Sequence, residues 1–165
     1  MKKKFTKEYL LNNRGCYKIE DIEKIPFKIN KITIHKLFKY LPIKDFNWFL
    51  IKKCDLTTKE KQLFALHCAK QVLPIYEEKY PGDKRVRECI ETTQLFIDGK
   101  IGVDELREKR NAADDADDAD AAYAAAYAAD AAYADAYVAD AVAYAADAVA
   151  AAKFKKSIWT FIKKL

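Results

Sequence analysis

Few residues in this sequence have types and spacings that could perform catalysis. The two histidines, His35 and His67, are isolated among apolar residues of expected helices, which favours a core role over that of a general base. The four glycines form no phosphate loop, and no nucleophile elbow or HExxH motif occurs. The acidic residues cluster where nothing would raise the pKa of a carboxylate. We therefore expect no enzymatic activity and no cofactor.

Metal binding and disulfide formation are both disfavoured by residue spacing. The cysteines form no CxxC pair and have no histidines at zinc spacing; they are Cys16, Cys54, Cys68 and Cys89. Their even number leaves disulfides open, but small buried thiols are the better prediction for a lysine-rich chain without an apolar leader. A cation could bind at Asp114–Asp120, yet that segment lacks the glycine and terminal glutamate of a calcium loop. We expect no metal, and a cytoplasmic location.

The most distinctive chemistry lies in an alanine-rich segment, residues 111–152. Residues 112–152 carry nine aspartates and no basic residue, whereas residues 1–111 carry 25 Lys and Arg against 16 acidic residues. The segment also repeats itself, because the ten residues from Asp120 and the ten from Asp130 are identical at eight positions. Alanine has the highest helix propensity, and no Gly or Pro interrupts the run. We expect an acidic helical arm, with disorder as an alternative; a β-solenoid is disfavoured because alanine is a poor strand former.

The arm presents side chains suited to contacts with a partner. On a continuous helix its five tyrosines fall within about 120°, the width of one helix face. Carboxylates and stacking rings together could occupy a basic groove that normally holds nucleic acid. The candidate partner-binding residues are Asp114, Asp115, Asp117, Asp118, Asp120, Tyr123, Tyr127, Asp130, Tyr133, Tyr137, Asp140 and Tyr144.

The length of the arm constrains its shape. An unbroken helix of ~48 residues would span about 70 Å, whereas a compact chain of this size measures on the order of 40 Å. The arm must therefore project, break and fold back, or be covered by a second chain. We favour a break between residues 112 and 130, where aspartate is densest, and close antiparallel packing of alanine-rich helices.

Residues 1–110 are expected to form a basic helical body. Thr33, Asp45 and Asp104 are candidate N-caps, Thr57 and Glu60 form a capping box, and Gly15 and Gly99 are expected to end helices. Pro74 should kink or end the helix that begins after Thr57. A short extended stretch is expected where Phe27, Ile29 and Ile32 alternate with polar residues. An alternative anion-binding site lies in this body, at Lys84, Arg85, Arg87, Arg107 and Arg110.

Residues 153–165 form a basic, amphipathic tail. Phe154, Ile158, Phe161 and Leu165 share one helical face, and five lysines surround it. Docking against the core is the simplest role, and membrane-surface or partner binding is the alternative. The predicted fold is therefore all-α, with a helical body (1–110), a long or broken Ala/Asp/Tyr-rich helix (111–152) and a short tail helix (153–165).

One block of the sequence resembles a known family. Val72-Leu-Pro-Ile-Tyr-Glu77 is followed by Tyr80-Pro-Gly-Asp-Lys-Arg-Val-Arg-Glu-Cys-Ile-Glu91, by Gly99, by Glu105-Leu106 and by an alanine-rich helix. Over about residues 63–113 this pattern is similar to the putative immunity protein family of bacterial and phage genomes. The arms of that family usually mix Ala with Arg, Asp and Trp, whereas this arm carries Asp and Tyr.

The resemblance implies a stoichiometric inhibitor of a toxin, nuclease or defence effector, of the immunity or phage counter-defence kind. It implies a protein partner, for which the arm's charge would select a basic surface. Two alternatives remain open: binding of nucleic acid or an anionic nucleotide by the basic body, and assembly into a homodimer or larger structural oligomer through the Ala/Tyr face.

Overall fold

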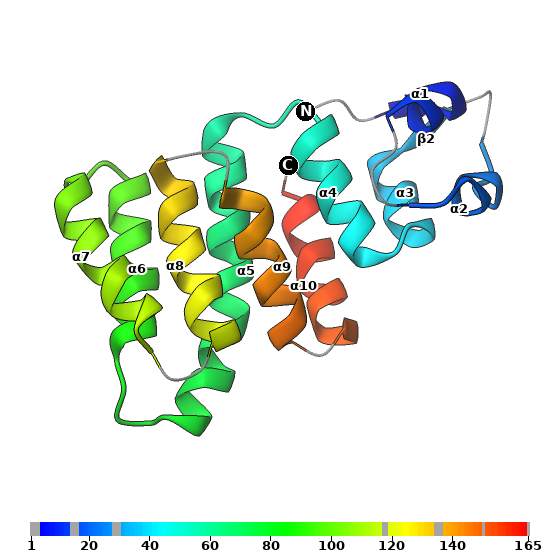
Figure 1. Cartoon of the computed structure of the whole chain (residues 1–165). Helices are drawn as coiled ribbons and strands as arrows, with labels where there is room; N and C mark the ends of the chain where they lie inside the picture. Colours follow the sequence, from blue (N-terminus) through cyan, green and yellow to red (C-terminus); the bar gives the residue numbers. More distant parts are fainter. Residues whose placement is uncertain are drawn as a thin grey trace. The chain divides into compact units, whose positions relative to one another are not determined.

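The computed structural model describes residues 4–13, 17–27, 31–116, 119–133, 137–149 and 151–164, which are mostly helical (Figure 1). This confirms the predicted all-α fold class. Contacts divide the chain into two compact units, residues 1–57 and 58–164. Residue 110, where the sequence-based division was placed, lies inside the second unit.

The first unit combines short helices with one small sheet. Strands β1 (Lys4–Thr6) and β2 (Lys31–Thr33) pair antiparallel, with Phe5 opposite Ile32. The helices are α1 (Lys7–Asn12), α2 (Ile19–Glu23), α3 (Ile34–Tyr40) and α4 (Ile43–Lys53). The expected extended stretch is thus β2, whereas β1 was not expected. The predicted helix stop at Gly15, and the residues Cys16 and Ile29, lie outside the described residues.

Aromatic packing holds the first unit together. The rings of Phe5 and Phe49 meet edge to face at 4.9 Å, and those of Phe38 and Phe46 at 4.8 Å. The hydroxyl of Tyr9 donates to the carbonyl oxygen of Lys53 at 3.0 Å, which ties α1 to the end of α4. Such rings bury a large apolar area, so they are the principal source of stability in this unit.

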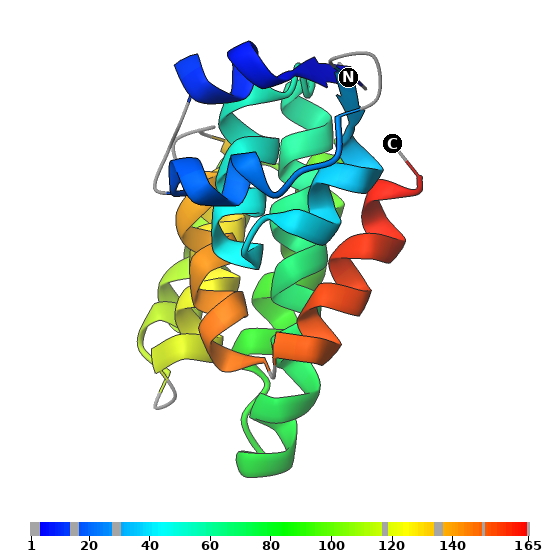
Figure 2. The same ribbon diagram turned by 90° about the vertical axis from the view of Figure 1, so that its right-hand side faces the viewer.

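In the part of the second unit that the structure describes, six helices form an array in which successive helices run in opposite directions (Figures 1 and 2). They are α5 (Thr58–Lys79), α6 (Arg85–Ile97), α7 (Val103–Asp114), α8 (Ala119–Tyr133), α9 (Val138–Ala148) and α10 (Ala151–Ile162). The predicted break in the arm is confirmed, because α7 ends at Asp114 and α8 begins at Ala119. A second break, not predicted, separates Tyr133 from Val138.

Helix α8 lies in the interior of the second unit, where it contacts α5, α6, α7 and α9. Nine of its alanines are at most 2 % exposed: Ala121, Ala122, Ala124, Ala125, Ala126, Ala128, Ala129, Ala131 and Ala132. Methyl side chains allow helix backbones to approach closely, which is why one helix can be covered from several directions. The alanine-rich segment is therefore part of a core and does not project as a rod.

Two predicted helix boundaries, at Thr33 and Gly99, agree with the structure. The hydroxyl of Thr33 accepts from the backbone N–H of Lys36 at the start of α3. Gly99, with φ of 72°, ends α6 in a Schellman motif, because its N–H donates to Phe96 and that of Lys100 to Leu95.

Two predictions about helix N-caps need correction, and of the kink or end predicted at Pro74 the end does not occur. Asp45 and Asp104 lie in the first turns of α4 and α7, and the N-cap positions belong to Pro42 and Gly102. In both cases the helix begins earlier than the aspartate, whose charge still favours the helix N-terminus. Helix α5 does not end at Pro74 but continues through it to Lys79.

The tail docks as a helix in the second unit. Phe154, Ile158 and Ile162 of α10 are buried. The ring of Phe161 lies 5.0 Å from that of Phe64 on α5. Leu165, also predicted for this face, lies outside the described residues. The simplest role expected for the tail, closure of a core, therefore agrees with the structure.

The close packing of α8 can be tested by enlarging one alanine. Ala125→Leu adds bulk where the carbonyl oxygen of Ala125 lies 3.5 Å from the thiol of Cys89 on α6. We expect the free energy of unfolding to fall by roughly 1–3 kcal/mol, because α6 and α8 must separate. Urea denaturation measures this change.

The matched control is Ala143→Leu, at an exposed position of α9. Its expected effect is within about 0.5 kcal/mol. Equal effects of the two substitutions would contradict an interior position for α8.

Candidate partner-binding surface

Four tyrosines from the alanine-rich segment gather where α8 and α9 pack together. The rings of Tyr127 and Tyr144 stack at 5.3 Å with an interplanar angle of 4°. Tyr123 lies 5.2 Å from Tyr144, and Tyr137 lies 5.9 Å from Tyr127. The contacts therefore link all four rings into one cluster that crosses from one helix to the other.

Helical spacing explains how the cluster forms. Tyr123 and Tyr127 are four residues apart on α8, and Tyr137 and Tyr144 are seven apart at the start and in the middle of α9, so each pair shares a face. The sequence analysis placed these tyrosines on one face of a single helix. In the structure the break before Val138 brings the two faces against each other. The side chain of Tyr133 lies outside the described residues.

The cluster is only partly covered. Tyr137 is 38 % exposed, and Tyr123, Tyr127 and Tyr144 are half-buried. Their hydroxyls make no hydrogen bond to another residue that the structure describes, so they can donate to a partner. Burial raises the pKa of Tyr127, and Tyr144, Asp140 and Asp114 nearby raise it further. The hydroxyl of Tyr127 consequently stays protonated at neutral pH.

Two carboxylates flank the cluster on α9. Asp140 and Asp147 are exposed, and their spacing from Tyr137 and Tyr144 places all four residues along one stripe of the helix. Asp140 was predicted as a partner-binding residue from sequence, whereas Asp147 was not. We call this set of residues the Tyr–Asp surface: Tyr123, Tyr127, Tyr137, Tyr144, Asp140 and Asp147.

Two other predicted aspartates are engaged by the protein itself. Asp130 is 4 % exposed, and both of its carboxylate oxygens lie 3.1 Å from Nε of Arg110 on α7. Nη1 of the same arginine donates to Asp114 at 2.9 Å. A buried carboxylate needs such a partner, because desolvating an unpaired charge is costly. Asp130 is therefore interior and does not lie on an accessible surface.

The remaining acidic candidates are less informative. Asp115 is exposed at the end of α7, where its carbonyl oxygen accepts from Nη1 of Arg85 at 2.7 Å. Asp117, Asp118 and the side chain of Asp120 lie outside the described residues.

Each residue of the alternative anion site makes hydrogen bonds within the protein. Arg87 donates to Glu77 at 2.6 Å and to Glu91, Arg107 pairs with Asp104, and Lys84 donates to the carbonyl oxygen of Pro81. Arg110 is occupied by the two aspartates described above. Their positive charges are thus largely compensated within the protein.

Arg85 is held by a well-defined acceptor. Its guanidinium donates to Asp83, which also accepts from the hydroxyl of Tyr76 at 2.5 Å. These bonds hold the pKa of Asp83 well below its usual range despite the opposing effect of burial. The segment Tyr80–Asp83, recognised from sequence as a turn, thus anchors the end of α5 to the beginning of α6.

The described cysteines are interior thiols, as predicted. Cys54, Cys68 and Cys89 are buried and form no disulfide with another residue that the structure describes. Burial raises the pKa of Cys89 to about 12, even though Thr93 and Arg110 act in the opposite direction. Among the described residues, no three His, Cys, Asp or Glu side chains are arranged to hold a metal ion. Nor does any described helix combine the length and apolar character that a membrane crossing requires.

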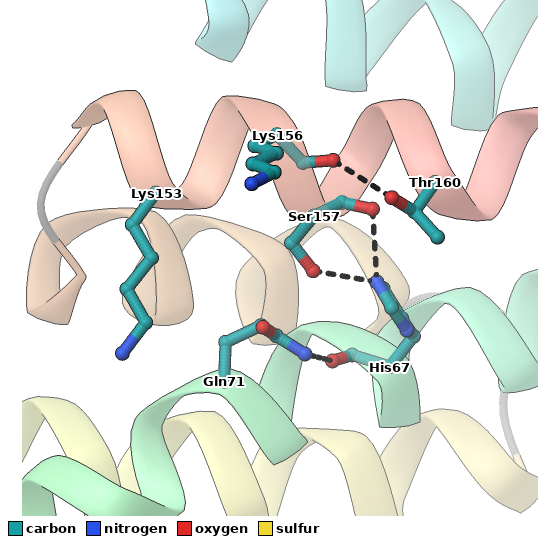
Figure 3. Close-up of a pocket in the computed structure, with 6 residues that line it drawn as sticks. All are labelled: His67, Gln71, Lys153, Lys156, Ser157 and Thr160. Atoms are coloured by element: carbon teal, nitrogen blue, oxygen red, sulfur yellow. Dashed lines mark hydrogen bonds between the residues drawn. The ribbon is translucent and has the colours of Figure 1, made fainter.

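One polar contact was not foreseen from sequence. His67 on α5 and Ser157 on α10 are 90 positions apart, and Nε2 of His67 lies 2.8 Å from Oγ of Ser157 (Figure 3). No local pattern connects two such distant residues. The amphipathic tail was the available signal, because it predicted that α10 would lie against other helices.

The role of Asp130 can be tested by removing its charge. Asp130→Asn leaves Arg110 with a weaker acceptor in a buried setting, so the free energy of unfolding should fall by about 1–3 kcal/mol. Urea denaturation of the variant and the parent protein measures the difference. Asp140→Asn is the control, since this exposed side chain should change stability by no more than about 0.5 kcal/mol. If Asp130→Asn were equally harmless, the buried pair would not stabilise the fold.

Comparison with known proteins identifies a family for most of the chain. A family model described as Imm-5 like putative immunity protein matches residues 55–160. The match covers α5 to α9 and most of α10, and so nearly the whole second unit, whereas most of the first unit lies outside it. No curated protein and no solved structure matches the chain. Because the matched segment is well over half of the sequence, the chain belongs to the Imm-5 like putative immunity protein family.

Proposed function

We propose that this protein is a non-catalytic, stoichiometric inhibitor of a protein toxin, nuclease or defence effector, and that it binds that effector through the Tyr–Asp surface. The family description supports an immunity role. The observation that carries the choice of surface is the group of four partly exposed tyrosine rings in mutual contact, flanked by the exposed carboxylate of Asp140.

Tyrosine clusters of this kind are suited to protein recognition. A tyrosine side chain offers a large contact area but has few rotatable bonds, so little conformational entropy is lost on binding. Here the rings already contact one another, which restricts them before any partner arrives. Preorganisation of this kind increases affinity, and tyrosine is among the residues enriched at binding hot spots.

The charge of the surface selects a basic partner. Residues 112–152 contain no Lys or Arg, and the exposed carboxylates of Asp140 and Asp147 give the Tyr–Asp surface negative charge. An arginine of the partner could stack on an exposed ring such as Tyr137 and donate to Asp140 at the same time. Such paired recognition favours Arg-rich sites, which toxins that bind nucleic acid commonly contain.

This proposal narrows the sequence-based hypothesis of a projecting acidic rod. The alanines of α8 are buried, and Asp130 and Asp114 are paired with Arg110. Among the described aspartates of this segment, Asp140 and Asp147 share one stripe of α9 with Tyr137 and Tyr144, so we assign any mimicry of nucleic acid to the exposed side of α9 and the neighbouring tyrosines of α8. The basic groove of the effector need only accept one short face, about three helical turns long.

The first experiment tests which residues bind the effector. The tagged protein is used to capture effectors from extracts of cells that carry the matching toxin, and the affinity of the purified partner is then measured. Tyr137→Ala should weaken binding by more than about tenfold, as expected for a hot-spot residue. Asp140→Lys should weaken it further and reduce its dependence on salt, because an attractive charge becomes repulsive.

The matched control is Tyr40→Ala, which removes a tyrosine of similar exposure, 39 %, from the first unit. Its affinity should equal that of the parent protein. If Tyr40→Ala and Tyr137→Ala weaken binding equally, the Tyr–Asp surface is not the binding site. If the partner recovered is a second copy of this chain, which mass measurement in solution would reveal, the surface is an oligomer interface and the inhibitor proposal fails.

A further inference from the structure

A polar cleft lies between α5 and α10, away from the residues of the Tyr–Asp surface. It has a volume of about 370 Å³, within the range of small-ligand sites. Every residue that lines it carries a polar or charged side chain; the lining consists of His67, Gln71, Lys153, Lys156, Ser157 and Thr160. The polar and charged ends of these side chains can contact a small polar or charged molecule, while their aliphatic carbons also contribute to the lining.

The charge around the cleft has one sign. A smaller adjoining pocket of about 270 Å³ shares His67 and adds Lys70 and Lys164. Neither pocket has Asp or Glu among its lining residues. Lys153, Lys156 and Lys164 form no ion pair with another residue that the structure describes. Because uncompensated positive charges at close range repel one another, an anion bound between them would be stabilised.

The geometry at His67 adds a directed donor. Nε2 of His67 lies 3.2 Å from the backbone carbonyl oxygen of Ser157, which can only accept, so this contact is a hydrogen bond in the ring form that carries a hydrogen on Nε2. In that form the hydroxyl oxygen of Ser157, 2.8 Å from the same nitrogen, accepts as well. Its own O–H hydrogen is then available to a ligand. In Figure 3 this hydroxyl lies on the side of α10 that faces His67. The Lys153 side chain runs from α10 toward α5, the helix that carries Gln71.

We propose that this cleft binds a phosphate group, free or on a small molecule, through Lys153, Lys156 and the hydroxyl of Ser157. Lysine ammonium groups and a hydroxyl donor are common ligands of phosphate oxygens. Gln71 donates to the carbonyl of His67, and Thr160 to that of Lys156, so these two residues shape the cleft and are not its principal donors. This proposal is independent of the one for the Tyr–Asp surface.

Binding of an anion should be coupled to the protonation of His67. Burial lowers the pKa of His67; the Ser157 backbone bond opposes this effect, and Lys164 and Lys70 lower the pKa further. The charged groups that line the space around the ring are Lys70 of α5, Lys153 and Lys156 of α10, and Lys164 just after α10; α6 contributes the neutral Gln94. A bound phosphate would offset these positive charges, so it should raise the pKa of His67, and by linkage its affinity should rise as the pH falls through that pKa.

The test is calorimetric titration of the full chain with inorganic phosphate and pyrophosphate, in a buffer free of other oxyanions. The double variant Lys153→Ala/Lys156→Ala should lose about tenfold or more in affinity, since two charge-assisted contacts are removed. Ser157→Ala should lose a smaller factor. The control Lys155→Ala removes an exposed lysine of the same helix that does not line the cleft, and it should bind as the parent protein does.

A second readout separates a site from diffuse attraction. The NMR signal of the His67 ring should show a higher pKa in the presence of phosphate, and this shift should vanish in the double variant. An arm with acetate tests whether any carboxylate suffices; equal affinity for acetate and phosphate would assign the cleft to carboxylates and overturn the proposal. Absence of measurable binding, or equal losses in Lys155→Ala and the double variant, would also overturn it.

Discussion

The second unit depends on how closely other helices can approach the backbone of α8. An ordinary amphipathic helix buries one stripe of large side chains and keeps the opposite side in water. Helix α8 instead carries methyl groups in several directions, and its alanines are buried among α5, α6, α7 and α9. Each alanine contributes little apolar area, but many short backbone distances add up in dispersion energy. The alanines by themselves, however, do not fix the rotation of α8 about its own axis.

The residues of α8 that are not alanine can fix this rotation. Asp130 is the one charged residue among the buried side chains that the structure describes, and Arg110 on α7 pairs with it there. A rotation of α8 about its axis by one residue, about 100°, would move this carboxylate away from its arginine. The same rotation would change how much of the Tyr123 and Tyr127 rings is exposed. A buried charge pair often adds little net stability, but it penalises wrong alignments. In this unit we interpret the pair as fixing the rotation of α8, and so the position of the tyrosines on the surface.

Local features of the fold were predictable because their causes are local. Thr33 and Gly99 define helix ends through bonds to residues a few positions away, and the tail helix follows from its apolar spacing. The arrangement of α8 and α9 was less predictable because alanine is compatible with both a solvated helix and an interior one. Composition indicated the break between α7 and α8, but it did not indicate the second break, between Tyr133 and Val138. As a result the tyrosines were placed on one helix face, whereas they meet across two helices.

The binding residues could likewise be predicted only in part from the sequence. The number of aspartates predicted an acidic arm. Sequence alone, however, does not distinguish a carboxylate that pairs with an arginine inside the protein from one that is exposed on the surface. Asp130 and Asp114 belong to the first kind, whereas Asp140 is exposed beside the rings. Two surface regions of the second unit thus differ in charge. The exposed face of α9 carries carboxylates, whereas the cleft between α5 and α10 is lined by lysines and by no carboxylate. A partner with basic residues would be drawn to one region and repelled by the other, so the division itself restricts the orientations in which an effector can dock.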